Sequence, residues 1–138
     1  MILLDTNICI YIIKRKPEEV LRHFQQYHPG NIGISSITLA ELQYGVAKSQ
    51  ARKRNSEALS EFLIPLEILS FGESATQAYG AIRTLLEQQG KIIGAMDLLI
   101  AAHAVSLDAV LVTNNVKEFK RVPDLKIENW VNTKSTES

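Results

Sequence analysis

The sequence lacks the features that mark secreted and membrane-embedded proteins. Its 138 residues include one cysteine, Cys9, which excludes an internal disulfide and fits a reducing compartment. No apolar run approaches the roughly 20 residues that span a bilayer. The apolar stretch 1–4 meets Asp5 at once and lacks the positive charge that begins a signal peptide. We therefore predict a cytoplasmic, single-domain protein with no membrane partner.

An excess of charge of one sign is also missing. Lys plus Arg equal Asp plus Glu at 15 each, so no global electrostatic field predicts a nucleic-acid or membrane partner. A neutral total still permits a local basic patch. Three basic clusters stand out in the sequence: Lys14 to Lys16, Lys48 with Arg52 to Arg54, and Lys117 with Lys120 and Arg121.

Several catalytic and cofactor motifs are absent. The chain has no G-x-S-x-G elbow, no G-x-G-x-x-G and no Walker loop, so serine hydrolases, dinucleotide binders and NTP binders lose their usual signals. The three histidines, His23, His28 and His103, show no zinc-like spacing with one another or with Cys9. We expect His103, which lies in a strongly apolar helix, to be a hydrogen-bonded core residue.

Short apolar strands alternate with amphipathic helices along the chain. Strands are predicted at residues 1–4, 32–37, 66–71, 110–113 and 126–130. Helices are predicted at 6–14, 17–27, 38–49, 51–63, 74–89 and 96–107. This order predicts an α/β fold, an α/β/α sandwich whose mostly parallel central sheet is flanked by helices. The domain would occupy residues 1–132, and 133–138 would form a frayed polar tail.

Three carboxylates stand where apolar segments meet helices. Asp5 follows the first strand, Glu41 lies near the start of a helix, and Asp97 opens an apolar helix. Because the carboxyl ends of parallel strands meet at one edge of a sheet, we expect these acids to converge there. Converging carboxylates repel one another unless a cation lies among them, and hard oxygen ligands suit Mg²⁺ or Mn²⁺. The pattern therefore predicts a metal site.

Each acid also has a purely structural interpretation. Asp5 and Asp97 are residues that favour helix N-cap positions, although Thr6 or Asn7 could cap the first helix as well. Thr38 begins a T-x-x-E capping box, which would satisfy backbone donors of its helix without any metal. No single acid is specific, and only their combination favours a functional site.

Four separated motifs together resemble the PIN-domain ribonucleases, and within them the VapC toxins of toxin–antitoxin pairs. The motifs are L-D-T-N at 4–7, S-x-T-x-x-E-L at 36–42, G-x-x-D-x-x-I-A-A at 94–102 and V-T-N-N-x-x-E-F at 112–119. The resemblance implies an endoribonuclease that depends on Mg²⁺ or Mn²⁺ and leaves a 5′-phosphate and a 3′-hydroxyl. It also implies a structured RNA substrate such as tRNA and inhibition by a cognate VapB-like antitoxin. We further expect a homodimer.

By this resemblance, Asp5, Glu41 and Asp97 occupy the positions of the family's three best-marked acids and would be the metal ligands. The chain departs from the pattern at the fourth acidic position, where many relatives have Asp and this sequence has Asn115. Glu118 lies close by and could supply the missing charge. An amide carbonyl can also ligate a hard cation, with less charge. Which of the two fills the position, and whether one or two ions bind, stays open.

Residues beside these acids are candidates for supporting roles. Thr6, Asn7 and Thr113 could orient ligands or water through hydrogen bonds, although each also suits a turn. Phosphate contacts that ignore base sequence are expected from the cluster flanking the active edge: Lys117, Lys120 and Arg121. Four aromatic residues could stack on bases, although core packing suits most of them: Tyr11, Tyr44, Phe119 and Trp130.

Two other functions fit the same motifs. The chain could be a non-catalytic PIN module that binds RNA or a partner, because Asn115 lacks the fourth charge. It could instead be a metal phosphoesterase that acts on DNA. For the toxin hypothesis, we expect an apolar groove between helices 17–27 and 51–63 that would receive an amphipathic segment of the antitoxin.

Overall fold

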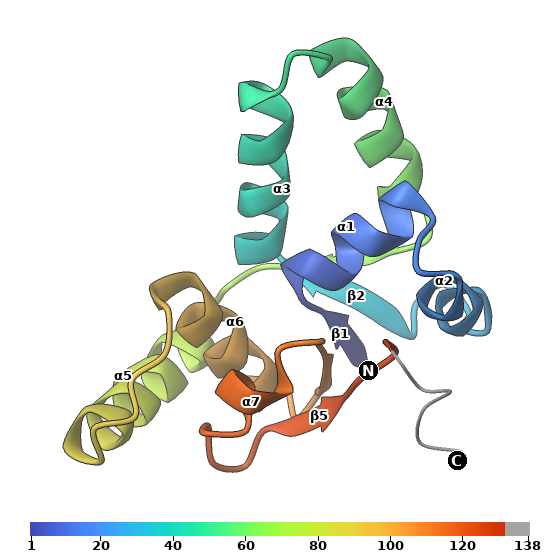
Figure 1. Cartoon of the computed structure of the whole chain (residues 1–138). Helices are drawn as coiled ribbons and strands as arrows, with labels where there is room; N and C mark the ends of the chain where they lie inside the picture. Colours follow the sequence, from blue (N-terminus) through green and yellow to red (C-terminus); the bar gives the residue numbers. More distant parts are fainter. Residues whose placement is uncertain (132–138) are drawn as a thin grey trace.

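The structure, a computed structural model, describes residues 1–131 and has a parallel sheet between two groups of helices (Figure 1). The strands are β1 (Ile2–Leu4), β2 (Ile32–Ser35), β3 (Glu67–Leu69), β4 (Val110–Val112) and β5 (Lys126–Glu128). The helices are α1 (Thr6–Lys14), α2 (Glu18–Gln25), α3 (Ser36–Lys48), α4 (Arg52–Leu63), α5 (Glu73–Gln88), α6 (Ala95–Ser106) and α7 (Val116–Phe119). The strand order is β3-β2-β1-β4-β5 with every pair parallel, which confirms the predicted sandwich.

The two faces of the sheet bury separate apolar clusters, because side chains alternate along each strand. Leu3 and Leu111 belong to the cluster that includes buried residues of α5 and α6. Leu4 and Val112, the next residue on each strand, belong to the cluster that includes residues of α1, α2, α3 and α4. Strands buried on both faces read as continuous apolar runs, which is why the sequence predicted them. Helices α3 and α4 form a hairpin that projects away from the sheet (Figure 1).

Strands β2 and β3 approach each other closely at Gly33. This residue pairs with Glu67, and a Cβ atom at position 33 would lie 2.6 Å from the carbonyl oxygen of Glu67. Any side chain there would force the edge strand β3 outward. The glycine is therefore required by the register of the sheet.

Helix α3 begins two residues earlier than the sequence predicted, at Ser36. Its N-cap is Ser35, whose hydroxyl oxygen accepts a hydrogen bond of 3.0 Å from the backbone N–H of Ile37. Ile37 is therefore helical, and the capping-box interpretation of Thr38 and Glu41 is wrong. The hydroxyl of Thr38 is instead buried without a hydrogen-bond partner among residues 1–131.

His103 ties this helix start to α6. Its Nδ1 atom lies 2.7 Å from the hydroxyl oxygen of Ser35, and the ring also forms a hydrogen bond with the backbone of Ser70. This hydrogen bond joins α6 to the residue that caps α3. Burial lowers the pKa of His103, which keeps the ring neutral in this role. The prediction of a buried, hydrogen-bonded histidine is confirmed.

The remaining differences lie toward the C-terminal part of the chain. Helix α7 was not predicted, since only a polar loop was expected after the fourth strand. Phe119 and Trp130 are 1% and 0% exposed, so core packing, and not base stacking, is their role. The tail predicted for 133–138 lies outside the described residues. Within residues 1–131, no helix has the length and apolarity needed to cross a membrane.

Candidate active site

Asp5 lies at the carboxyl end of β1, beside the end of the neighbouring strand β4. It is 4% exposed and caps α1, because its Oδ1 atom accepts a hydrogen bond of 2.9 Å from the N–H of Ile8. The hydroxyl of Thr113, just past β4, also bonds its carboxylate. The structural and functional interpretations of Asp5 are thus compatible. Thr6 and Asn7, the other candidate caps, are the first residues of α1.

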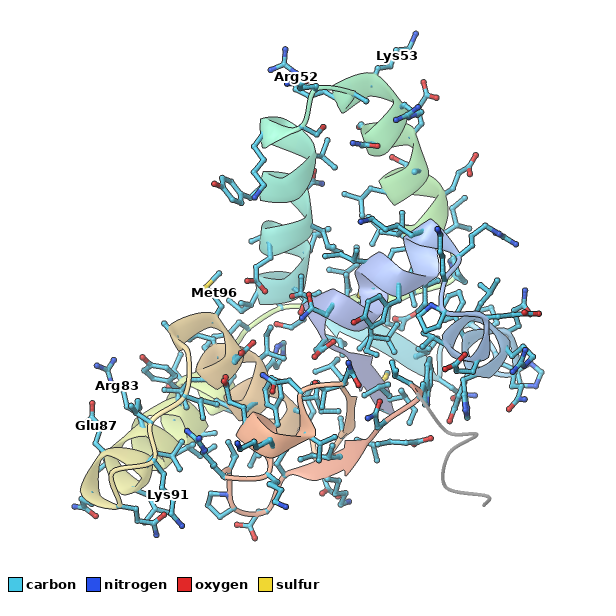
Figure 2. All side chains as sticks on the ribbon, in the orientation of Figure 1. Arg52, Lys53, Arg83, Glu87, Lys91 and Met96 are labelled. Atoms are coloured by element: carbon cyan, nitrogen blue, oxygen red, sulfur yellow. The ribbon has the colours of Figure 1, made fainter. Side chains whose placement is uncertain are left out.

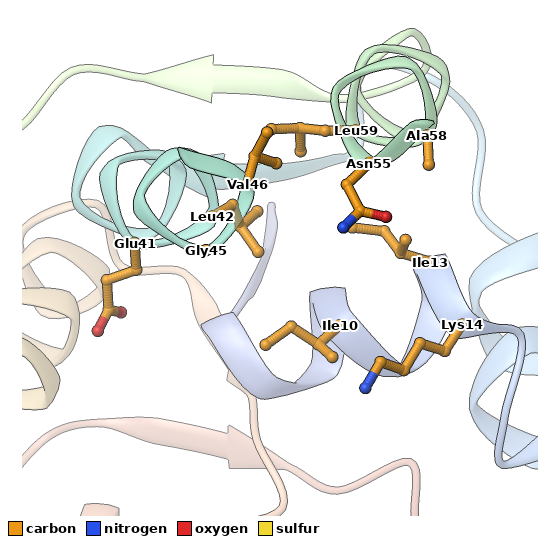
Figure 3. Close-up of a pocket in the computed structure, with 10 residues that line it drawn as sticks. All are labelled: Ile10, Ile13, Lys14, Glu41, Leu42, Gly45, Val46, Asn55, Ala58 and Leu59. Atoms are coloured by element: carbon orange, nitrogen blue, oxygen red, sulfur yellow. The ribbon is translucent and has the colours of Figure 1, made fainter. Parts of the chain in front are cut away.

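Glu41 reaches the same edge from α3. The hydroxyl of Thr6 at the start of α1 donates a hydrogen bond to Glu41 Oε1. Glu41 is also close enough to Asp5 that its negative charge helps to raise the pKa of Asp5, after the larger effect of burial. Figure 3 shows the carboxylate of Glu41 pointing away from Asn55 and Leu59 of α4.

Asp97 and Glu118 meet at this edge as a hydrogen-bonded pair. Asp97 lies in the first turn of α6, and Gly94 occupies the N-cap position, so the interpretation of Asp97 as a cap is wrong. Glu118 comes from α7, and its Oε1 atom also accepts a hydrogen bond of 3.3 Å from the N–H of Gly94. The side chain of Asn115 bonds Glu118 as well. Asn115 therefore contacts the carboxylate that brings a fourth negative charge.

The four acids Asp5, Glu41, Asp97 and Glu118, hereafter the acidic centre, hold more negative charge than their surroundings stabilise. Burial first, and then Glu118, Asp5 and Glu41, raise the pKa of Asp97 to about 7. The pKa of Glu118 is lowered because it accepts the hydrogen bond from Asp97. The two carboxyl groups titrate as a pair that retains a proton near neutral pH. A cation placed among them would displace that proton and relieve the repulsion.

The donor set of the acidic centre fits a hard divalent cation. Its members offer carboxylate oxygens, which are the ligands that such ions prefer. Among residues 1–131, no three His, Cys, Asp or Glu side chains are already arranged around one point as ion ligands. Asp5 is buried where it caps α1, and the other three acids of the centre are half-buried.

The predicted phosphate-binding cluster lies beside this centre. It lines a concave pocket of about 380 Å³, whose lining residues are Lys117, Lys120, Arg121, Gly90 and Lys91. Lys91 was missed by sequence reasoning, because it stands in the loop between α5 and α6, far from the other three cations in the chain. The only sequence signal near Lys91 was Gly90, which predicted the end of a helix and the start of a loop.

A family profile described as "PIN domain" matches residues 2–125. The chain belongs to the PIN-domain family, among its VapC ribonucleases. It is 53% identical over 129 residues to "Ribonuclease VapC2" of Rickettsia felis, which covers 93% of this chain and 96% of that protein. It is 43% identical to the "tRNA(fMet)-specific endonuclease VapC" of Shigella flexneri, over 93% and 96% of the two chains.

Solved structures agree with this membership. The VapBC2 structure from Rickettsia felis, bound to a DNA fragment from their promoter, contains a chain with a TM-score of 0.89 and 52% identity over 94% of this chain and 99% of that one. The DNA-bound VapBC structure from Salmonella typhimurium gives a TM-score of 0.89 at 43% identity, over 94% and 97%. The predicted family and ribonuclease activity are confirmed, and PIN-domain ribonucleases depend on divalent metal ions.

Proposed function

We propose that this chain is an endoribonuclease toxin that hydrolyses phosphodiester bonds in tRNA with Mg²⁺ or Mn²⁺ bound at the acidic centre. The observation that carries the proposal is the convergence of Asp5, Glu41, Asp97 and Glu118 at the carboxyl edge of the sheet. The substrate is inferred from relatives named tRNA(fMet)-specific endonucleases, at 43% and 44% identity.

The assignment of ligands follows from the contacts of the acidic centre. Asp5 and Asp97 are assigned to the metal with Glu41 as a third ligand. Glu118 takes the fourth acidic position, and Asn115 supports it through its side-chain hydrogen bond. When bound, a divalent ion supplies positive charge that acidifies water and stabilises charge developing on the attacked phosphate.

The neighbouring hydroxyl groups keep these carboxylates in place. Thr113 holds Asp5, and Thr6 holds Glu41, so two side chains from different elements are oriented before substrate arrives. Asn7 contributes its backbone N–H to Asp5. In the reaction a water oxygen bonds to phosphorus and the bond from phosphorus to the 3′ oxygen breaks. The products are a 5′-phosphate and a 3′-hydroxyl, which takes up the proton.

Control by a VapB-like antitoxin is also part of the proposal, and two adjoining grooves support it. One is a cavity of about 290 Å³ where Ile10 and Ile13 of α1 lie opposite Leu42 and Val46 of α3 and Leu59 of α4 (Figure 3). The other, of about 350 Å³, lies between α2 and α4, at the place where the sequence predicts a groove. An amphipathic antitoxin segment suits such apolar surfaces. The solved neighbours are themselves VapBC structures. A cytoplasmic location and a homodimer complete the proposal.

Incubation of the purified protein, freed from any bound partner, with unfractionated tRNA and Mg²⁺ or Mn²⁺ tests the proposal. Discrete tRNA fragments that disappear with EDTA and with Asp5→Asn are expected. Single-stranded RNA and DNA serve as comparison substrates. Cleavage of DNA in place of RNA would favour a DNA phosphoesterase. Folded protein that cuts nothing with any metal would favour the non-catalytic module.

A further inference from the structure

A basic surface lies next to the acidic centre and is assembled from two distant parts of the chain. Its lining residues are Lys91 after α5 and three cations from α7 and the residues after it: Lys117, Lys120 and Arg121. We call these four side chains the basic cup. Gly90 is the remaining lining residue, so among residues 1–131 no carboxylate lines this concave pocket of about 380 Å³.

The backbone of Lys91 is fixed by the way α5 ends. Gly90 has a φ of 66°, a left-handed conformation that glycine adopts without strain. Its N–H bonds the carbonyl of Glu87 at 3.1 Å, and the N–H of Lys91 bonds the carbonyl of Leu86 at 2.8 Å. This pair of hydrogen bonds is the Schellman motif, which holds the chain after a helix in a defined path. The backbone path of Lys91 is therefore fixed, and its side chain lines the same pocket as Lys117 of α7.

Arg121 joins the basic cup to the acidic centre. Its guanidinium donates a hydrogen bond of 3.1 Å to the carbonyl of Ile92, which fixes the loop between α5 and α6 against α7. Its positive charge also contributes to lowering the pKa of Glu118. Because Glu118 is hydrogen-bonded to Asp97, the cup and the acids adjoin each other through one side chain.

The lysines of the cup keep their charge available for a ligand. Within residues 1–131, the ion pairs are those of Arg22 with Glu18, Arg83 with Glu87, and Lys126 with Asp108. Glu87, an acid close to Lys91 in the chain, is thus engaged by Arg83 on its own helix. Figure 2 shows these three side chains at the outer end of α5 and in the loop that follows.

We propose that the basic cup binds backbone phosphates of the RNA strand whose adjacent phosphodiester lies at the acidic centre. This inference rests on the proposed function. The protein has no net charge to attract RNA, and four carboxylates repel it, so positive charge is needed beside them. Contacts to phosphates are blind to base sequence and weaken as salt rises. The cup therefore holds and orients the strand, and base selection lies elsewhere.

Equilibrium binding of labelled unfractionated tRNA tests the cup. Lys91→Gln, Lys117→Gln and Lys120→Gln are combined in an Asp5→Asn background that prevents cleavage, with EDTA present. Arg121 is retained because it holds the loop. The matched control replaces the same number of cations by Gln at the tip of the α3–α4 hairpin, where Figure 2 shows Arg52 and Lys53: Arg52, Lys53 and Arg54.

The cup variant is expected to bind tRNA about tenfold more weakly at moderate salt, and its log–log salt slope should fall by about 2. The control should stay within about twofold of the parent. Equal losses in both variants, or none in the cup variant, would overturn the inference. Loss of poly-glutamate binding with tRNA binding intact would assign the cup to an acidic protein segment. Cup-dependent tRNA binding by an active-site-intact protein that never cleaves would refute the proposed function alone.

Discussion

Asp5 shows how one side chain serves both the fold and the site. Its carboxylate caps α1 and accepts the hydroxyl of Thr113, so the helix start and the end of β4 are held together. Burial of this carboxylate raises its pKa, because the ionised form is less stable in the folded protein than in water. Carboxylates gathered in this way destabilise the metal-free fold and should be stabilised by a cation.

Replacing Asp97 by Asn should therefore raise the melting temperature of the metal-free protein by a few degrees near pH 8. The folded-state pKa of about 7 exceeds the ordinary 3.8. The folded protein thus binds more protons than the unfolded chain between those values, and stability falls as pH rises through that window. The effect of Asp97→Asn should shrink toward pH 4. Mg²⁺ should stabilise the parent and not the variant.

Thermal unfolding in EDTA and in Mg²⁺ at several pH values makes this comparison. Asp108→Asn is the control, because Asp108 is a surface acid whose pKa is lowered by Lys126 and whose φ of 53° suits Asn. A lower melting temperature for Asp97→Asn than for the parent near pH 8 would contradict the account of the acidic centre.

Thr113→Val should weaken metal-dependent cleavage by roughly 10- to 100-fold, since side chains that orient ligands typically have effects of this size. Valine keeps the shape of threonine and removes the hydroxyl that bonds Asp5 and accepts from the N–H of Asn115 at 2.9 Å. The dependence of cleavage rate on Mn²⁺ concentration is the measurement. Thr113→Ser should restore the parent behaviour, and a fully active Thr113→Val would refute the orienting role.

The sequence predicted that acids would converge at one edge of the sheet, but it did not predict their individual contacts. Asp5, Glu41 and Asp97 could be chosen as candidates because each stands in a short local motif, and such a motif can be recognised from the sequence alone. The choice between Asn115 and Glu118 could not be made, because it depends on α7, a helix of four residues with too few positions to show periodicity. Lys91 could not be predicted as a member of the basic cluster, because it is distant from Lys117 in the sequence and only the fold brings the two side chains to one pocket.

At the scale of secondary-structure elements, the start of α3 shows how a distant contact overrides a local signal. The T-x-x-E pattern favoured a helix from Thr38. The structure begins the helix at Ser36, because Ser35 is both a cap and a partner of His103 on α6. No local pattern contains that contact. The shift places Glu41 in the second turn of α3, where it meets Thr6 and not its own helix start.

Gly33→Ala should destabilise the protein by about 1–3 kcal/mol, because the new methyl group overlaps the carbonyl of Glu67 and pushes β3 outward. Gly80→Ala provides the matched control. Gly80 lies inside α5, and a methyl group added there would meet no atom of residues 1–131 within 4 Å, so alanine should stabilise the helix by about 0.5–1 kcal/mol. Denaturant unfolding of both variants gives the comparison. Equal free energies of unfolding for Gly33→Ala and the parent would contradict this account, because β3 would then move outward without loss of stability.

At the scale of the whole molecule, the alternation of strands and helices was sufficient to predict the three layers and the parallel sheet. The sequence did not predict how far the α3–α4 hairpin projects, since this depends on which helix faces pack. That projection creates the cavity between α1, α3 and α4 beside the groove that was expected.

Ala58→Lys should block antitoxin binding, because Ala58 lines both grooves and a lysine would fill them with a charged chain. Ser60→Lys, on the exposed side of the same helix, is the control. Co-expression with the small protein encoded beside the toxin should relieve the toxicity of Ser60→Lys and fail to relieve that of Ala58→Lys. Both variants should cleave tRNA at the parent rate. If co-expression relieves the toxicity of both variants, the antitoxin binds at a site other than these grooves.

Direct measurement of Mn²⁺ binding tests the acidic centre most closely, by titration of the folded, partner-free protein followed by electron paramagnetic resonance. The parent and Asp108→Asn should bind equally, Glu118→Gln should bind more weakly, and Asp97→Asn should lose at least about tenfold in affinity. If Asp97→Asn binds Mn²⁺ as tightly as the parent, the catalytic ion is held by other residues and the acidic centre has been misassigned.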